Sequence, residues 1–197
     1  SAAARWRPHC LMAERSAYMP TQPEHRPLPE HRRRGPGYLF LDIDGVLLPF
    51  GGEAVGGFEF PRRCLDALAS IMTAAGPQVV LSSTWRCDPH AVRAIREQLY
   101  AYGEPLASIS LVACTDPSLH SERQWEIAAW LKAHAASGVD VTRFVVLDDL
   151  DCVDGKANQR HRPMFEHRCV LVESSEGLND RDAEAAIAIL ARPARRF

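Results

Sequence analysis

Two stretches decide the fold: Tyr38-Leu39-Phe40-Leu41-Asp42-Ile43-Asp44-Gly45 and Phe144-Val145-Val146-Leu147-Asp148-Asp149. Each is a short apolar run, typical of a buried strand, that ends in a pair of aspartates. Carboxylates at the end of a buried strand are costly unless something neutralises them, because removing an unpaired anion from water is strongly unfavourable. The two stretches therefore predict strands whose acidic ends need a positively charged partner.

A hard cation is the simplest partner for these carboxylates. Mg²⁺ prefers oxygen ligands, needs only one or two carboxylates, and keeps water and substrate phosphate in its remaining positions. Each cluster alone also has a structural interpretation, with Asp44-Gly45 as a turn and Asp148-Asp149 as a helix cap. Taken together, the two clusters favour a Mg²⁺ site and phosphate chemistry.

Composition limits the classes of protein that the chain can represent. Its 197 residues are 46% apolar, which suits one domain with a full core, and the formal net charge of −2 leaves nucleic-acid binding to a local patch. The six cysteines form no C-x-x-C pair, which argues against a zinc site or a disulfide framework and favours a reducing cytoplasm. No apolar run approaches the length of a membrane span, so we expect no membrane partner.

Residues 1–37 differ from the remainder in being rich in proline and arginine. They hold six of the fourteen prolines and the run Arg32-Arg33-Arg34. This density of proline is incompatible with a helix or a central strand, so we expect an extended arm that packs on the core or stays mobile. The folded domain is then expected over residues 38–197.

Within residues 38–197, apolar runs alternate with helical patterns, which is typical of an α/β protein with a parallel sheet and helices on both faces. The expected strands span 38–43, 78–82, 109–113, 143–147 and 169–172. The expected helices span 62–75 and 121–136, the latter with Ser121 and Gln124 as a capping box, and two more begin at Asp88-Pro89 and Asn179-Asp180. The glycine-rich residues 49–58 are expected to form a flap or short hairpin.

The expected strand order brings the acidic clusters together. In such sheets, ligands bind beyond the carboxyl ends of the strands, where the strand order reverses. If the strand at 38–43 is central, with the next two strands on one side and the last two on the other, the strand at 143–147 is its neighbour. The ends of these two strands carry all four aspartates.

This set of motifs resembles the haloacid dehalogenase (HAD) superfamily of phosphohydrolases, from about Tyr38 to the end of the chain. Its D-x-D motif is matched by Asp42-Ile43-Asp44, and its last acidic motif by Asp148-Asp149. Its hydroxyl motif, a strand that ends in Ser or Thr, is matched by 79–82, with Ser83 or Thr84 as alternatives to Ser82. Its basic motif is matched by Arg123, favoured because it opens a helix, or by Lys132.

The resemblance implies a role for each matched residue. Asp42 is the expected nucleophile that forms an aspartyl-phosphate, and Asp44 the expected general acid and base. Mg²⁺ is expected to bind Asp42, the main-chain carbonyl of Asp44, and Asp148, with Asp149 as a ligand or orienting group. Ser82 is expected to bond to a phosphate oxygen, and Arg123 or Lys132 to stabilise the transferring group. Because HAD dehalogenases lack the second aspartate of D-x-D, Asp44 speaks against carbon–halogen chemistry.

The spacing of the motifs leaves no room for the cap domain that many HAD enzymes carry, and a site with no lid admits large substrates. Residues 82–86 and 172–180 are also similar to HAD domains associated with RNA-repair proteins. Arg32-Arg33-Arg34, Trp85-Arg86 and the basic run at 156–162, beginning with Lys156, favour nucleic acid. A tryptophan such as Trp85 is more often a packing residue than a base platform, and a solvated loop explains the basic run equally well.

Three functions remain open from the sequence. The first is a Mg²⁺-dependent phosphatase that acts on phosphorylated substrates such as RNA or DNA ends. The second is a small-molecule phosphatase or nucleotidase whose site is closed by the arm or by a dimer partner. The third is a binding protein on a HAD scaffold, which the retention of Asp42, Asp44, Asp148 and Asp149 disfavours, because a non-catalytic scaffold gains nothing from such a charge cluster.

Overall fold

The fold of the chain is a twisted parallel sheet with helices packed on both faces. The computed structural model describes residues 37–50, 58–115, 122–154 and 161–192. Apart from Gly37, the arm expected at 1–37 lies outside the described residues, as do 51–57 of the expected flap and Lys156.

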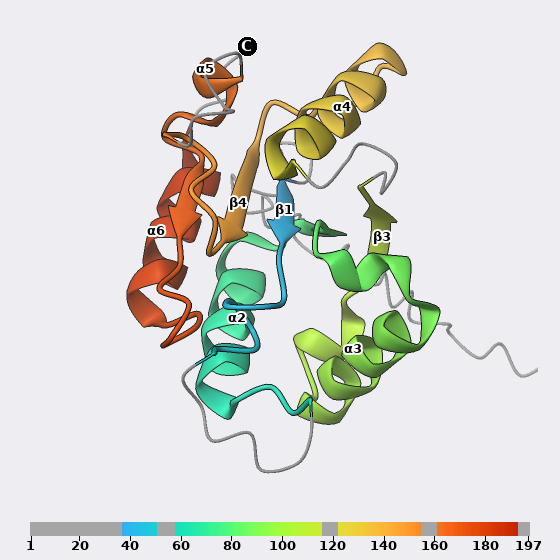
Figure 1. Cartoon of the computed structure of the whole chain (residues 1–197), viewed down its shortest axis with the longest axis vertical. Coiled ribbons are helices and arrows are strands. Elements are labelled where there is room, and N and C mark those ends of the chain that lie inside the picture. Colours follow the sequence, from blue (N-terminus) through green and yellow to red (C-terminus); the bar gives the residue numbers. More distant parts are fainter. Residues whose placement is uncertain (1–36, 51–57, 116–121, 155–160, 193–197) are drawn as a thin grey trace, which may run out of the picture.

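The sheet has five strands in the order β3-β2-β1-β4-β5, with β1 in the centre (Figure 1). The strands are β1 (Tyr38–Leu41), β2 (Gln78–Leu81), β3 (Leu111–Cys114), β4 (Phe144–Asp148) and β5 (Cys169–Leu171), and all pairs are parallel. The predicted parallel arrangement, with the two acidic strands side by side, is confirmed.

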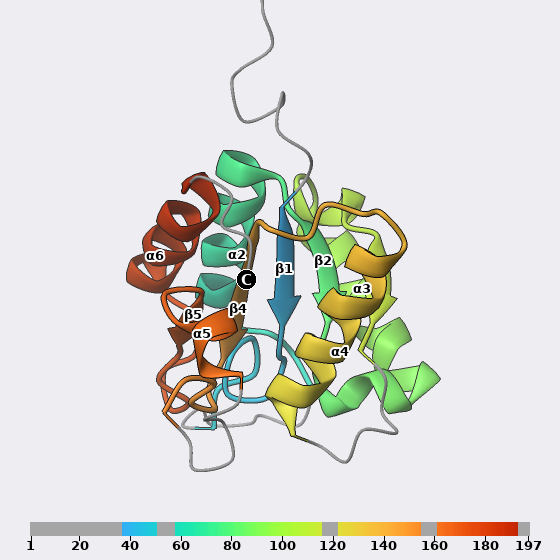
Figure 2. The same cartoon turned by 90° about the horizontal axis from the view of Figure 1, so that it is seen from above.

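Alternate side chains of the strands point to opposite faces of the sheet and pack into two separate hydrophobic cores. On β1, Leu39 and Leu41 pack against α2 (Arg62–Ala75), α3 (Pro89–Tyr102) and α6 (Asp180–Ala191). Tyr38 and Phe40 point to the other face, toward α4 (Arg123–Ala136) and the short α5 (Arg162–Phe165). Figure 2 shows helices on both sides of the strands. A strand buried on both faces reads as a continuous apolar run, which is why the sequence signal for β1 and β4 was strong.

Several predicted boundaries need correction. β1 ends at Leu41 instead of residue 43, because the carbonyl of Ile43 already accepts the N–H groups of a turn from Val46, Leu47 and Leu48. The third strand starts two residues later than predicted, because Ile109 closes a 3-10 turn, η2 (Leu106–Ser108). β2 and β5 end one residue earlier than predicted, and β4 lies one residue later, at Phe144–Asp148.

The helix starts follow the predicted caps in two cases and differ in a third. Asp88 caps α3 and Asn179 caps α6 through a complete capping box. The predicted capping box of α4 is wrong: the helix starts at Arg123 after an N-cap at Glu122 that makes no side-chain bond. Gln124 bonds to the carbonyl of Cys152 instead, and Ser121 lies outside the described residues.

The described part of the chain contains no cap domain between β1 and β2 or between β2 and β4, since the undescribed segments there, 51–57 and 116–121, are too short to fold as domains. Among the described helices, none combines the length and the apolar character that crossing a membrane requires.

Candidate active site

The site forms at the carboxyl ends of β1 and β4, where the sheet register brings the two acidic clusters together. Leu41 pairs with Leu147, and Asp42 N–H donates to the Leu147 carbonyl over 3.0 Å. One carboxylate oxygen from each of Asp42, Asp148 and Asp149 lies within 4.8 Å of the others. Asp42 and Asp148 are buried, so three like charges converge where water shields them little.

A glycine makes room for this convergence. Gly45 has a φ of +72°, a backbone conformation that side chains other than glycine rarely adopt. A Cβ atom at this position would lie 2.5 Å from Asp149 Oδ2, closer than any real contact. The Gly45 of the Asp-Ile-Asp-Gly stretch is therefore required for the turn and for the position of Asp149.

Arg123 is the cation that the structure itself places among these carboxylates. It lies at the start of α4, and its Nε donates to Asp148 Oδ2 over 2.7 Å. Its Nη2 lies 3.3 Å from Asp42 Oδ1, and its Nη1 lies 3.6 Å from Glu126 Oε2. Burial disfavours the charge on Arg123, but the surrounding carboxylates outweigh it and raise the pKa of this guanidinium. Arg123 therefore stays charged and joins the two strand ends.

The carboxylates retain a surplus of negative charge despite Arg123. Burial is the largest cause that raises the pKa of Asp148, to about 7, while Arg123 opposes that shift. Burial also raises the pKa of Asp149, with Asp42 adding to the shift. One guanidinium is thus insufficient for three carboxylates, and the oxygen-only donor set is the kind that Mg²⁺ prefers. The residues present fit a Mg²⁺ ion.

The hydroxyl of Ser82 is the unsatisfied polar group of this edge. Ser82 follows β2 and its N–H donates to the Leu41 carbonyl over 3.0 Å, which sets it beside Asp42. The residue is fully buried, yet its Oγ has no hydrogen-bond partner among the described residues. A buried hydroxyl without a partner costs about 1–3 kcal/mol and needs an explanation.

Asp44 is oriented by Trp85, a contact that the sequence did not predict. Trp85 lies on η1 (Thr84–Cys87), and its Nε1 donates to Asp44 Oδ2 over 3.0 Å. Burial is the largest cause that raises the pKa of Asp44, and the Trp85 bond lowers it. Asp44 is half-buried, so it keeps access to protons from solvent. Trp85 acts here as a positioning residue.

Beneath Arg123 lies a second buried ion pair that sequence reasoning missed. Arg86 Nη2 lies 2.6 Å from Glu126 Oε1, and both side chains are almost completely buried. Glu126 Oε2 also accepts a bond from the hydroxyl of Thr115 over 3.3 Å. Glu126 therefore sits between two arginines. One sign of this ion pair is visible in the sequence: Glu126 is a charged residue on the apolar face of α4, three residues after Arg123.

Comparison with known families assigns the fold. A family model described as the HAD domain in Swiss Army Knife RNA repair proteins matches residues 38–183. The chain belongs to this family. Comparisons with curated proteins and with solved structures found no match. Family membership supports a phosphohydrolase type of function in an RNA-repair context, and HAD domains generally use Mg²⁺.

Not every residue that the sequence nominated lies beside the carboxylates. Lys132 is exposed on α4, nine positions beyond Arg123 and so about 13 Å further along the helix axis. The structure therefore brings Arg123 to the carboxylates and leaves Lys132 outside the site.

Two residues nominated for substrate binding have structural partners. Arg86 donates to the carbonyls of Ser82, Ser83 and Thr115 in addition to its ion pair, which uses most of its hydrogen-bond donors. Ser83 is buried, and its Oγ caps η1 by accepting the Trp85 N–H. Both side chains hold the loop after β2, and their contact with substrate stays a prediction.

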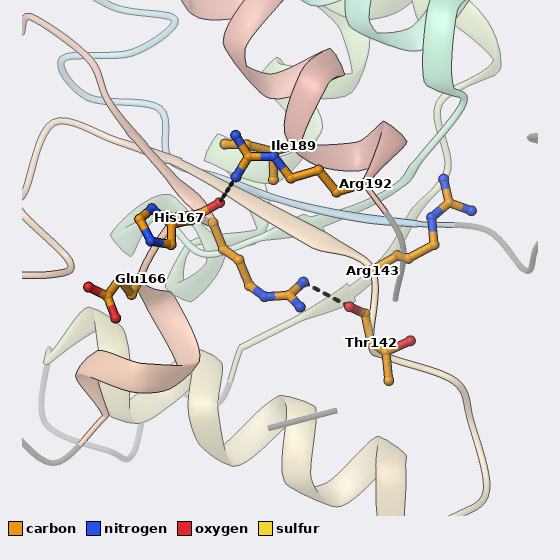
Figure 3. Close-up of a pocket in the computed structure, with 7 residues that line it drawn as sticks. Thr142, Arg143, Glu166, His167, Ile189 and Arg192 are labelled. Atoms are coloured by element: carbon orange, nitrogen blue, oxygen red, sulfur yellow. Dashed lines mark hydrogen bonds between the residues drawn. The ribbon is translucent and has the colours of Figure 1, made fainter. Parts of the chain in front are cut away.

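A cavity of about 340 Å³ lies at the opposite end of the sheet, before β4 and at the end of α6 (Figure 3). Its arginines bind neighbouring main chain: Arg168 donates to the Thr142 carbonyl over 2.8 Å, and Arg192 to the His167 carbonyl over 3.2 Å. Arg143 likewise donates to the Leu190 carbonyl. These three arginines therefore hold neighbouring segments together at the end of the sheet opposite the HAD carboxylates.

The raised pKa of Asp148 predicts how the stability of the metal-free HAD domain depends on pH. The folded pKa is about 7 and the ordinary value is 3.8, so the folded state binds more protons than the unfolded state between these values. The free energy of unfolding is then expected to fall as pH rises through this window, by about 4 kcal/mol in total. Thermal melts in EDTA at pH 5, 6, 7 and 8 measure it.

Asp148→Asn is the control for this pH dependence, because it removes the carboxyl whose pKa is raised to about 7 and should make the curve less steep. Adding Mg²⁺ should raise the melting temperature of the wild type more at pH 8 than at pH 5, since metal ligands must be deprotonated. A wild-type melting temperature that stays constant from pH 5 to 8 in EDTA contradicts the assignment.

Proposed function

We propose that this HAD domain is a Mg²⁺-dependent phosphomonoester hydrolase that acts through an aspartyl-phosphate on the ends of polynucleotides. The observation that carries the proposal is the convergence of Asp42, Asp148 and Asp149 within 4.8 Å at the end of the sheet. Such a cluster of like charges, two of them buried, is costly, and a bound cation offsets that cost. The RNA-repair description of the family supports the choice of polynucleotide substrates.

Asp42 is the proposed nucleophile. Its Oδ1 accepts the Ile43 N–H over 2.8 Å and faces Arg123. Its Oδ2 has no hydrogen-bond or ion-pair partner among the described residues, so this oxygen is available for attack. It would form a bond to phosphorus while the bond from phosphorus to the leaving oxygen breaks. When bound, Mg²⁺ would neutralise charge on Asp42, Asp148, Asp149 and the phosphate.

Asp44 is the proposed proton donor and acceptor. Burial raises the pKa of its carboxyl, as a group that must donate a proton near neutral pH requires. It would give its proton to the leaving oxygen in the first step. In the second step it would take a proton from the water that attacks phosphorus, as the bond between phosphorus and Asp42 breaks and phosphate leaves.

Ser82 and Arg123 are the proposed partners of the phosphate oxygens. The buried Ser82 hydroxyl lacks a partner among the described residues and lies beside Asp42, so a phosphate oxygen would satisfy it. Arg123 carries donors already aimed at the strand ends and would stabilise negative charge on the transferring group. These contacts need no rearrangement of the sheet, which is the condition for efficient electrostatic catalysis.

The test is phosphate release from 5′- and 3′-phosphorylated oligonucleotides, mononucleotides and small phosphate esters, with Mg²⁺ and with EDTA. We expect release that depends on Mg²⁺, falls to the uncatalysed background in EDTA, and is fastest for an oligonucleotide end. A preference for mononucleotides or small esters would favour the small-molecule phosphatase instead. No release from any substrate, with Mg²⁺ present, would favour a binding protein on a HAD scaffold.

A further inference from the structure

A second cavity adjoins the proposed proton donor. It has a volume of about 480 Å³ and is lined by Asp44, by Leu48 from the turn after β1, by Phe58, by Trp85 on η1, and by His90 and Ala94 on α3. These residues come from four segments that meet next to the carboxyl end of β1. The cavity therefore continues the site on the side of Asp44.

We propose that this cavity binds the terminal nucleoside of a phosphorylated polynucleotide, with its base against Phe58 and Trp85. The inference rests on the proposed function and names the part of the substrate that the site selects. The general acid must lie within hydrogen-bond reach of the leaving oxygen. Because Asp44 lines the cavity, the group attached to that oxygen extends into it.

Phe58 is the feature that points to a planar ligand. Its side chain is 69% exposed, and it meets Trp85 edge to face with ring centroids 5.4 Å apart. Behind Trp85, the buried Phe60 packs at a centroid distance of 6.4 Å. Three aromatic rings therefore lie together, and two of them, Phe58 and Trp85, line the cavity.

The exposed ring is held in place. Gln98 on α3 donates from Nε2 to the Phe58 carbonyl and accepts the Phe60 N–H at Oε1, each over 2.6 Å. This pair of bonds fixes the main chain on both sides of residue 59. An exposed aromatic side chain on a fixed backbone loses little entropy when a ligand stacks on it, which favours binding.

The lining also discriminates between classes of leaving group. Leu48, Ala91 and Ala94 are apolar, so the cavity suits the face of a base better than a sugar alone. Thr84, Asp88 and His90 add polar side chains that can bond to the edge of a base. A phosphoserine or phosphothreonine peptide carries no ring near its phosphate and would leave these aromatic groups uncovered. Base stacking on aromatic side chains tolerates any sequence, as an enzyme of polynucleotide ends requires.

The test compares an oligonucleotide whose phosphorylated terminal residue carries a base with the same oligonucleotide whose terminal residue is abasic, at the 5′ and at the 3′ end. We expect the wild type to prefer the base by about tenfold in kcat/KM. Phe58→Ala should remove that preference by lowering kcat/KM for the base-bearing end to about that of the abasic end. The matched control is Tyr100→Ala, since Tyr100 is 75% exposed on α3 and does not line the cavity, and it should keep the preference.

Binding of the same oligonucleotides, measured in EDTA by calorimetry, separates this inference from the proposed hydrolase. If no phosphate is released but the wild type binds the base-bearing end more tightly and Phe58→Ala does not, the nucleoside site stands and the hydrolase fails. If phosphate is released equally from the base-bearing and the abasic terminal residue, and Phe58→Ala changes neither rate, the hydrolase stands and the nucleoside site is overturned. A phosphotyrosine peptide that outcompetes both oligonucleotides also overturns it.

Discussion

Replacing Asp42 by Asn is expected to lower kcat for phosphate release by at least about 10³-fold, because an amide cannot attack phosphorus as a carboxylate does. The substitution keeps the shape of the side chain, and its amide oxygen can still accept the Ile43 N–H that Asp42 Oδ1 accepts now. The fold should therefore survive. The measurement is the initial rate of phosphate release, with circular dichroism and a thermal melt to confirm folding.

A direct readout of the covalent step accompanies the rate. Wild type that is quenched with acid during turnover of a ³²P-labelled substrate should carry protein-bound phosphate that hydroxylamine removes, and Asp42→Asn should carry none. Asp180→Asn is the matched control, because Asp180 is an exposed aspartate in the first turn of α6, and its rate should equal the wild type. An Asp42→Asn enzyme within a few-fold of wild type would remove Asp42 as the nucleophile.

The sheet and the meeting of its acidic ends could be predicted because they depend on patterns that are local in the sequence. β1 and β4 are buried on both faces, so each reads as a continuous apolar run with an aspartate at its end. Once these strands are neighbours, parallel register alone carries Asp42 to Asp148. The position of the site followed from topology, with no knowledge of side-chain contacts.

The roles of Trp85 and Arg86 could not be predicted in the same way, since they depend on where η1 places each side chain. A Trp-Arg pair after a strand predicts a surface for nucleic acid. The 3-10 turn directs Trp85 to Asp44, beside the cavity proposed to bind a base, and directs Arg86 into the protein. The partner of Arg86, Glu126, is forty residues away on α4. Such a pairing between distant segments leaves only a weak trace in one sequence: a charged residue on an otherwise apolar helix face.

Replacing Arg123 by Ala is expected to damage both stability and activity. Asp148 and Asp42 would lose their neighbouring cation while they remain buried, and breaking a buried ion pair costs about 3–5 kcal/mol. The loss should be smaller at pH 6 than at pH 8, because Asp148 can take up a proton when Arg123 no longer lowers its pKa. Thermal melts at both pH values measure this difference. Phosphate release should fall by about 10²–10³-fold.

Lys132→Ala decides between the two basic residues that the sequence left open. Lys132 is exposed on α4, so its loss should leave the melting temperature unchanged and the rate within about twofold of wild type. Arg123→Lys should recover part of the stability but less of the activity, since one ammonium group cannot reach Asp148 and Asp42 in the forked geometry of the guanidinium. If Lys132→Ala loses as much activity as Arg123→Ala, the cation that stabilises the phosphate does not come from the start of α4. The contacts of Arg123 would then serve only to hold the metal-free carboxylates together.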